Sequence, residues 1–229
     1  MDPSTANRKK ILPNRQVVVQ PHLYNEIVSD QRPYESVIDK GTAAVILAAG
    51  KGERYSGQTH KLLADFRGKP VLQWVVDSVL QADFSDVYII SGAVNLHDES
   101  SLNLTSDKIT IVQNHNFDEG QATSLRSALA VAGQDGHTSI TVGLGDMPLV
   151  PSSAWKAVSE AEGQLVTATF SGNRCPPVKI EDELWSLIPI SGDEGARSLL
   201  RLRPDLVNEV LCEGSPIDID TRSDLERWN

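Results

Sequence analysis

Short apolar runs and amphipathic helical patterns alternate along the chain from residue 43 onward. The runs at 43–47, 87–90, 109–112, 139–142 and 165–169 are only four or five residues long, and a glycine closes several of them. Runs of this length bounded by turn residues are typical of strands that are buried on both faces of a parallel sheet.

Helical patterns fill the intervals between these runs. Pro70 stands at the start of one, where proline is tolerated, and apolar residues then recur on one face: Val71, Leu72, Val75, Val76, Val79 and Leu80. Further helices are predicted at 121–132, from Pro151 onward, and near 181–187 and 194–202. The order predicts a three-layer α/β fold, with a mostly parallel, Rossmann-like sheet and helices on both faces.

Ligands of such a sheet bind beyond the carboxyl ends of its strands. The loop after the first run reads LAAGKGERYSGQTHK over residues 47–61. Its small residues let a ligand approach the backbone, and exposed N–H groups in such a turn bind anions. Lys51, Arg54 and Lys61 add the positive charge that a triphosphate needs. The spacing is neither a Walker loop nor GxGxxG, so a plain turn with solvated charges remains the alternative.

A second segment of interest follows the run at 109–112 and leads into a helix. Gly120 indicates a special backbone angle or a close approach by a ligand. Thr123 and Ser124 are expected to cap the helix and to offer hydroxyl groups. A glycine turn before an ordinary capped helix is the simpler alternative.

Aspartates stand at two places where a metal ion could bind. Asp146 follows the run at 139–142, and Mg²⁺ prefers one or two carboxylates together with phosphate oxygens and water. Later in the chain, Asp218 and Asp220 share one face of an extended segment. A turn aspartate and a helix cap are the alternatives. Asp193 is expected to be an N-cap, and the N–H groups behind it, with Arg197, could hold a phosphate.

These motifs together resemble a known family over roughly residues 43–228. They are LAAG-x-G-x-R followed by KLL and GKPVL, then an Asn, an aromatic residue, EG and SL, then GDMP, and finally DIDT-x-x-DL. They look like the signature of the molybdenum cofactor nucleotidyltransferases, or MobA-like NTP transferases. Within that family the molybdenum cofactor cytidylyltransferases look most similar.

The resemblance implies a role for each matching residue. It implies that Lys61, Arg54 and Asp146 are catalytic and that Asp146 and Asp220 hold Mg²⁺, with Asp220 favoured over Asp218. It places Asp193 and Arg197 at the acceptor. The residues implied in nucleotide binding are Leu47, Ala48, Ala49, Gly50, Lys51, Gly52, Lys61, Asn114, Gly120 and Ser124.

The chain departs from the family pattern at several positions. The stretch between Arg54 and Lys61 is one residue longer, His60 stands where the family commonly has Asn or Asp, and Pro176 replaces a histidine.

The resemblance implies a Mg²⁺-dependent enzyme that transfers a nucleoside monophosphate from an NTP to a phosphorylated acceptor and releases pyrophosphate. LAAG rather than LAGG favours CTP, with molybdopterin as the acceptor and a molybdenum hydroxylase as the protein that receives the product. Two alternatives stay open: a nucleotidyltransferase for a sugar or polyol phosphate, and a non-catalytic cofactor-binding maturation protein.

Composition narrows the partners and the location. The net charge of -10 argues against nucleic acids and anionic membranes, which would repel the chain. The two cysteines form no CxxC pair, and no run approaches the roughly 20 apolar residues of a membrane span, so we expect a cytoplasmic protein. Residues 1–40 hold four prolines and predict an N-terminal arm or small extension, or else a disordered tail, before a nucleotidyltransferase domain at 41–229.

Overall fold

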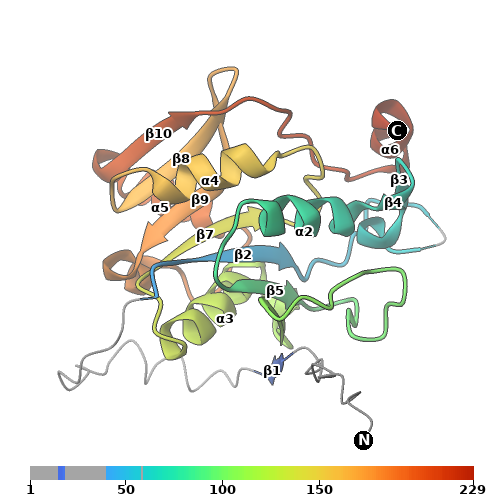
Figure 1. Cartoon of the computed structure of the whole chain (residues 1–229), viewed down its shortest axis with the longest axis horizontal. Helices are drawn as coiled ribbons and strands as arrows, with labels where there is room; N and C mark the ends of the chain where they lie inside the picture. The colour runs from blue at the N-terminus through green and yellow to red at the C-terminus, as the bar shows by residue number, and fades with distance from the viewer. Residues whose placement is uncertain (1–14, 19–39, 58) are drawn as a thin grey trace, which may run out of the picture.

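The computed structural model describes residues 15–18, 40–57 and 59–229, and within them eight strands form one sheet (Figure 1). Across the sheet the order is β1-β6-β5-β2-β7-β9-β8-β10. The strands are β1 (Arg15–Val18), β2 (Thr42–Ala48), β5 (Val87–Ser91), β6 (Ile109–Gln113), β7 (Ser139–Leu144), β8 (Leu165–Phe170), β9 (Asn173–Glu181) and β10 (Val207–Leu211). All neighbours pair in parallel except at β9, which runs antiparallel to β7 and to β8.

Helices cover both faces of this sheet, as Figure 1 shows for α2 and α4 on one side and α3 on the other. The α-helices are α2 (Val71–Gln81), α3 (Gln121–Gln134), α4 (Ser152–Glu160), α5 (Ala196–Leu202) and α6 (Arg222–Trp228). Short 3₁₀ turns are η1 (Lys61–Leu63), η2 (Phe117–Glu119), η3 (Asp182–Leu187) and η4 (Pro204–Leu206), and β3 (Asp65–Phe66) pairs with β4 (Lys69–Pro70) in a separate hairpin. The predicted three-layer, mostly parallel α/β fold is confirmed.

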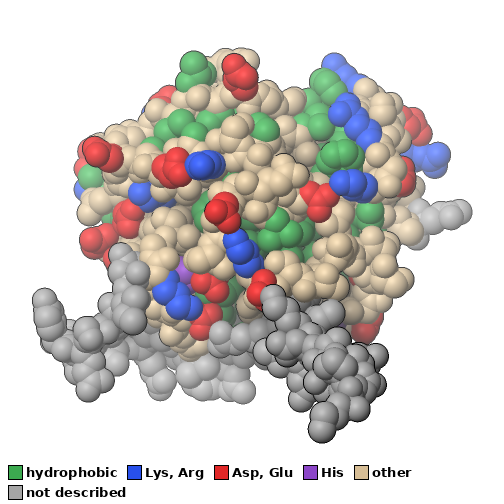
Figure 2. Space-filling view, viewed as in Figure 1, with side chains coloured by type: hydrophobic (Ala, Val, Ile, Leu, Met, Phe, Trp, Pro, Cys, Tyr) green, Lys and Arg blue, Asp and Glu red, His purple; other side chains and the backbone are tan. Residues whose placement is uncertain are grey.

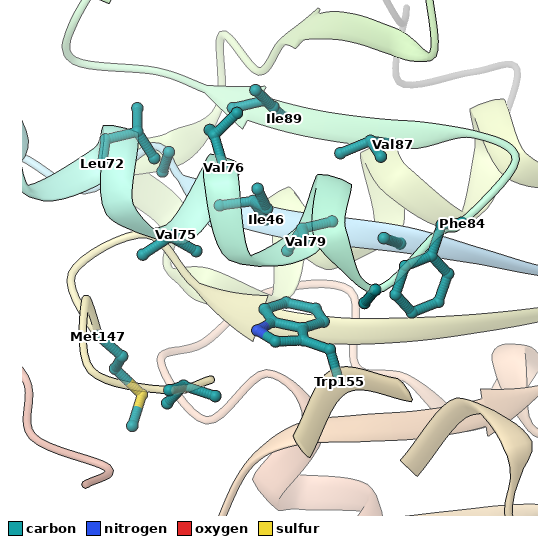
Figure 3. Close-up of a cluster of buried hydrophobic side chains, with 14 of the residues drawn as sticks. Ile46, Leu72, Val75, Val76, Val79, Phe84, Val87, Ile89, Met147 and Trp155 are labelled. Atoms are coloured by element: carbon teal, nitrogen blue, oxygen red, sulfur yellow. The ribbon is translucent and has the colours of Figure 1, made fainter. Parts of the chain in front are cut away.

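The central strand β2 explains why the core has two halves. Ala44, Ile46 and Ala48 point into the core on the α2 and α4 side, while Ala43, Val45 and Leu47 point into the core on the α3 side. Side chains of a strand alternate between faces, so a strand covered by helices on both sides must be apolar throughout. In the first half, Ile46 and Ile89 meet Val76 and Val79 of α2 and the indole of Trp155 (Figure 3).

Two strands, one predicted helix and the start of another helix differ from the predictions. Strands β9 and β10 were not expected, because β9 carries Pro176 and Pro177 and β10 has only partly buried and exposed residues. The segment near 181–187 is a 3₁₀ turn instead of an α-helix, and it begins at Asp182. The next helix begins at Ala196 with Gly195 as its N-cap, so the prediction that Asp193 is the N-cap was wrong.

The start of α3 also lies earlier than the capping prediction required. Its N-cap is Gly120, and no side chain caps this end of the helix. The chain turns into the helix at a backbone φ of 106°, which glycine tolerates, so Thr123 and Ser124 fall inside the first turn instead of before it.

Of the N-terminal segment, the structure describes only β1 and Lys40; the rest of the predicted arm at 1–40 lies outside the described residues. Strand β1 includes Val17 and pairs in parallel with β6 at one edge of the sheet. Among the described residues no helix has the length and apolarity needed to cross a membrane. On the face shown in Figure 2, acidic and basic side chains are interspersed among the described residues.

Candidate functional site

A cavity of about 750 Å³ opens at the carboxyl ends of β2 and β7. This is the position at which α/β sheets bind ligands, because loops from several strands converge there. Of the residues predicted for the site, all but Asn114 line this cavity: Leu47, Ala48, Ala49, Gly50, Lys51, Gly52, Arg54, Lys61, Gly120, Ser124, Asp146, Asp193, Arg197 and Asp220. The structure thus brings together residues that span most of the described chain.

Lys61 lies between two aspartates at the floor of this cavity. Its Nζ donates to Asp146 Oδ2 at 2.6 Å and to Asp220 Oδ1 at 2.8 Å. The other oxygen of Asp220 accepts from the guanidinium of Arg54 at 2.9 Å. The side chains of Lys61 and Asp220 are only 11% and 18% exposed, whereas that of Arg54 is 75% exposed. Water therefore screens the lysine–aspartate contacts weakly and the arginine contact strongly.

Three different elements hold this cluster together. Lys61 is the first residue of η1, Asp146 follows β7, and Asp220 precedes α6. The C-terminal segment docks through Ile219, whose N–H donates to the Asp146 carbonyl at 2.9 Å and whose side chain is fully buried against Phe66 and Val71. Because Ile219 points inward, its neighbour Asp220 is delivered to the cavity beside Asp146.

The charges of the cluster shift its proton affinities. Burial by itself would lower the pKa of Lys61, but Asp146 and then Asp220 outweigh burial and raise the pKa above its usual value, so Lys61 is an ammonium ion at neutral pH. Burial raises the pKa of Asp146, the charge of Lys61 opposes this rise, and the nearby Asp220 and Asp218 add to it. The ionised form of Asp146 therefore depends on a cation beside it.

The carboxylates suit a divalent ion that arrives with phosphate. The second oxygen of Asp146, Oδ1, is buried and lacks a hydrogen-bond partner within the described chain, so it is free to coordinate a cation. In that same part of the chain, no group of three or more His, Cys, Asp or Glu side chains forms a complete metal site. One or two carboxylates are what Mg²⁺ takes from a protein when phosphate oxygens and water complete its coordination.

The small-residue loop is fixed by its neighbours. Gly145 donates its N–H to the Leu47 carbonyl at 2.9 Å, and Gly92 lies so close that a Cβ there would be 2.6 Å from the Ala49 carbonyl oxygen. At the rim of the cavity, Lys51 forms an ion pair of 2.6 Å with Asp118 of η2. The loop is thus held against the sheet on one side and against η2 on the other.

Asn114 does not reach the cavity. It is 4% exposed, and its amide donates to the hydroxyls of Thr123 and Ser124 at 2.9 Å each. Its carbonyl oxygen accepts from the N–H of Asn116 at 2.9 Å. Asn114 therefore anchors the start of α3, while Ser124 beside it lines the cavity. In this geometry Asn114 does not contact a ligand in the cavity directly.

Close packing within the protein accounts for the glycine at position 120. Besides its positive φ, a Cβ at this position would lie 2.5 Å from the carbonyl carbon of Gly192. The Gly192 carbonyl accepts from the N–H of Ala122 at 2.8 Å, and the Gly192 N–H donates to the backbone carbonyl of Glu119 at 2.9 Å. These contacts bring the Gly192–Asp193 turn, and with it one wall of the cavity, against the start of α3.

Several lining residues had not been predicted as site residues. Arg174 and Cys175 come from the unexpected strand β9, and Gln121 also lines the cavity. Asp218, which the sequence offered as a weaker metal ligand than Asp220, lines it too. Burial raises the pKa of Cys175, with Arg197 opposing and Asp218 reinforcing the rise, which places all three groups near one another. The sequence held one signal that this region differs: Pro176, directly after Cys175, departs from the family pattern.

Comparisons with known proteins agree with this geometry. Residues 44–209 match the model of the MobA-like NTP transferase domain. The nicotine blue oxidoreductase of Paenarthrobacter nicotinovorans is 31% identical over 196 residues, which are 80% of this chain and 94% of that protein.

Solved structures share the fold. Rv0371c from Mycobacterium tuberculosis H37Rv superposes with a TM-score of 0.71 at 25% identity, over 82% of this chain and 96% of the other. A complex of Rv0371c with manganese superposes at 0.64 and 22% identity, over 82% and 97%. An inositol-1-phosphate CTP transferase from T. maritima superposes at 0.62 and 16% identity, over 81% and 91%. The extent of the domain match and the identity to the curated relative show that this chain belongs to the MobA-like NTP transferase family.

Proposed function

We propose that this chain is a nucleotidyltransferase that moves a nucleoside monophosphate from an NTP, preferably CTP, to a phosphorylated acceptor. The observation that carries the proposal is the position of Lys61, which contacts both Asp146 and Asp220 inside a cavity whose rim is the small-residue loop. Cations, backbone N–H groups and paired carboxylates are what the transfer of a phosphoryl-type group requires, because this chemistry depends on alignment and charge neutralisation.

The residues divide the work as follows. The N–H groups of the loop at 47–52 and the side chains of Lys51, Arg54 and Lys61 would bind the triphosphate. Lys61 and Arg54 would turn from the aspartates toward the phosphates and stabilise the negative charge that builds up on them. An oxygen of the acceptor phosphate would form the new bond to the α-phosphorus as the bond to the bridging oxygen breaks and pyrophosphate leaves. An ionised phosphate needs no general base.

Asp146 and Asp220 would hold a divalent ion, with Mg²⁺ preferred. When bound, the ion supplies neutralisation of the phosphate charge and fixes the triphosphate relative to the acceptor. The free Oδ1 of Asp146 supports this assignment, and so does the manganese complex of a protein with the same fold.

The acceptor would lie toward Asp193 and Arg197, where Arg174 and Arg197 offer positive charge for its phosphate. Molybdopterin is our preferred acceptor, with a molybdenum hydroxylase receiving the product, and the LAAG form of the loop supports CTP. A sugar or polyol phosphate is the second candidate, supported by the shared fold with a CTP transferase for inositol-1-phosphate. We assign residues 41–229 to the transferase unit and residues 1–40 to an N-terminal arm.

Family membership alone does not fix the reaction, since one relative carries the name of an oxidoreductase. The direct test incubates the purified chain with CTP, GTP, ATP or UTP, Mg²⁺ or Mn²⁺, and either a molybdopterin-type pterin phosphate, inositol phosphate or a hexose phosphate. Pyrophosphate release that depends on both nucleotide and acceptor is the expected result. Nucleotide binding without pyrophosphate release from any acceptor would instead identify a cofactor-binding maturation protein.

A further inference from the structure

His60 connects the two sides of the loop that precedes Lys61. Its Nε2 lies 3.0 Å from the carbonyl oxygen of Gly50, and its Nδ1 accepts from the N–H of Leu62 at 3.3 Å. The ring is thus the N-cap of η1 at one nitrogen and a tether to the small-residue loop at the other.

These two contacts define one state of the ring. Because Nδ1 accepts a hydrogen bond from a backbone N–H, it carries no proton, and the proton of the neutral ring is then on Nε2. Nε2–H can therefore donate to the Gly50 carbonyl, and both nitrogens are used by the backbone. His60 is also outside the set of residues that line the cavity. It has no nitrogen left for a nucleobase, so its role toward the ligand is indirect.

The third contact comes from Gly52. A Cβ at Gly52 would lie 3.1 Å from Nε2 of His60 and 3.2 Å from Cγ of Lys61. The backbone of the loop therefore packs directly against both side chains, and a positive φ of 65° turns it toward them. The described residues between Gly52 and His60 are mostly exposed, and the ring ties the start of this loop to its end.

We propose that His60 is a positioning residue, which holds the loop at Gly50–Gly52 and the side chain of Lys61 at the spacing that a bound triphosphate requires. The proposal rests on the proposed function of the site. An imidazole suits this role because its two nitrogens lie on different sides of the ring, and each can bond to a different backbone segment. Misplacing such groups by about 1 Å can lower a rate roughly 100-fold.

Three variants separate the two contacts. In His60→Asn the side-chain oxygen stands as far along the chain as Nδ1, so the N-cap is kept and the tether is lost. In His60→Gln the terminal amide stands as far along as Nε2, so the tether is kept and the cap is lost. His60→Ala loses both. His97→Ala is the matched control, since His97 is an exposed histidine that does not line the cavity.

The measurements are kcat and KM for the NTP by pyrophosphate release, the Kd for the NTP by calorimetry without acceptor, and the melting temperature. We expect His60→Ala to lower kcat by about 10- to 100-fold and to weaken nucleotide binding, with His60→Gln restoring most of both. His97→Ala should match the wild type. The proposal is wrong if His60→Ala stays within twofold of the wild type, or if His60→Gln is as impaired as His60→Ala. A wild type that releases no pyrophosphate would refute the proposed function instead, and the calorimetric comparison would still test the tether.

Discussion

Replacing Lys61 by methionine tests whether its ammonium group holds the two aspartates together. Methionine keeps the length of the side chain but removes the charge. The two aspartate oxygens that contact Nζ at 2.6 and 2.8 Å can lie at most 5.4 Å apart. At an effective dielectric constant of about 20, two carboxylates at that distance repel each other by about 3 kcal/mol. For a chain of this size, that loss lowers the melting temperature by roughly 6–12 °C.

A divalent ion should reverse this loss, because it can take the place of the ammonium group between the carboxylates. We would melt wild type and Lys61→Met in EDTA and again with millimolar Mn²⁺, without nucleotide. The variant should melt well below the wild type in EDTA and gain more than the wild type from Mn²⁺. Lys108→Met is the control, since Lys108 pairs with the exposed Asp83 and such pairs contribute about 0–1 kcal/mol. Equal melting of Lys61→Met and wild type in EDTA would refute the reasoning.

Four further outcomes are expected. Asp146→Asn should lower the rate of pyrophosphate release by about 10²–10³ with the fold intact, and a loss below tenfold would remove Asp146 from the mechanism. Thr221→Ala breaks the capping box with Asp224 and should reduce the free energy of unfolding in urea by about 1 kcal/mol. Gly120→Ala should cost about 1–3 kcal/mol in the same assay, whereas Gly50→Ala, with no atom within 4 Å of the added Cβ, should cost less. Burial lowers the pKa of His60 below its usual 6.5. The stability that the neutral ring contributes is therefore complete above pH 6.5 and is lost as the pH falls through the lowered pKa. The free energy of unfolding of His60→Asn should depend less on pH in that range than that of the wild type.

The parts of the fold that the sequence predicts are those in which burial alone determines the pattern. Strand β2 is apolar at almost every position because helices cover both of its faces, and this is visible in the sequence. Strand β9 is not visible, since its pairing with β7 and β8 overrides the prolines at its centre. Strand β10 lies at an edge and carries exposed residues, so it has no apolar run either.

The candidate site shows a similar division. Lys61 and Asp146 could be predicted because a cation in a loop and a carboxylate at a strand end both face the ligand side of the sheet. Asn114 follows a strand in the same way, yet its amide turns into α3, and local sequence does not distinguish these two directions. The tether at His60 depends on a backbone carbonyl ten residues away, and such a contact cannot be predicted from residue types.

The docking of Ile219 has a consequence for how the protein comes into being. During synthesis Asp146 and the strands up to β9 leave the ribosome well before Ile219 and Asp220 do, and β10 leaves shortly before them. The sheet can then fold before Lys61, Asp146 and Asp220 are all in place, and the cluster is complete once the buried Ile219 packs its segment against Phe66 and Val71. Completion of this charged cluster therefore depends on the docking of Ile219, which follows every described strand in the order of synthesis.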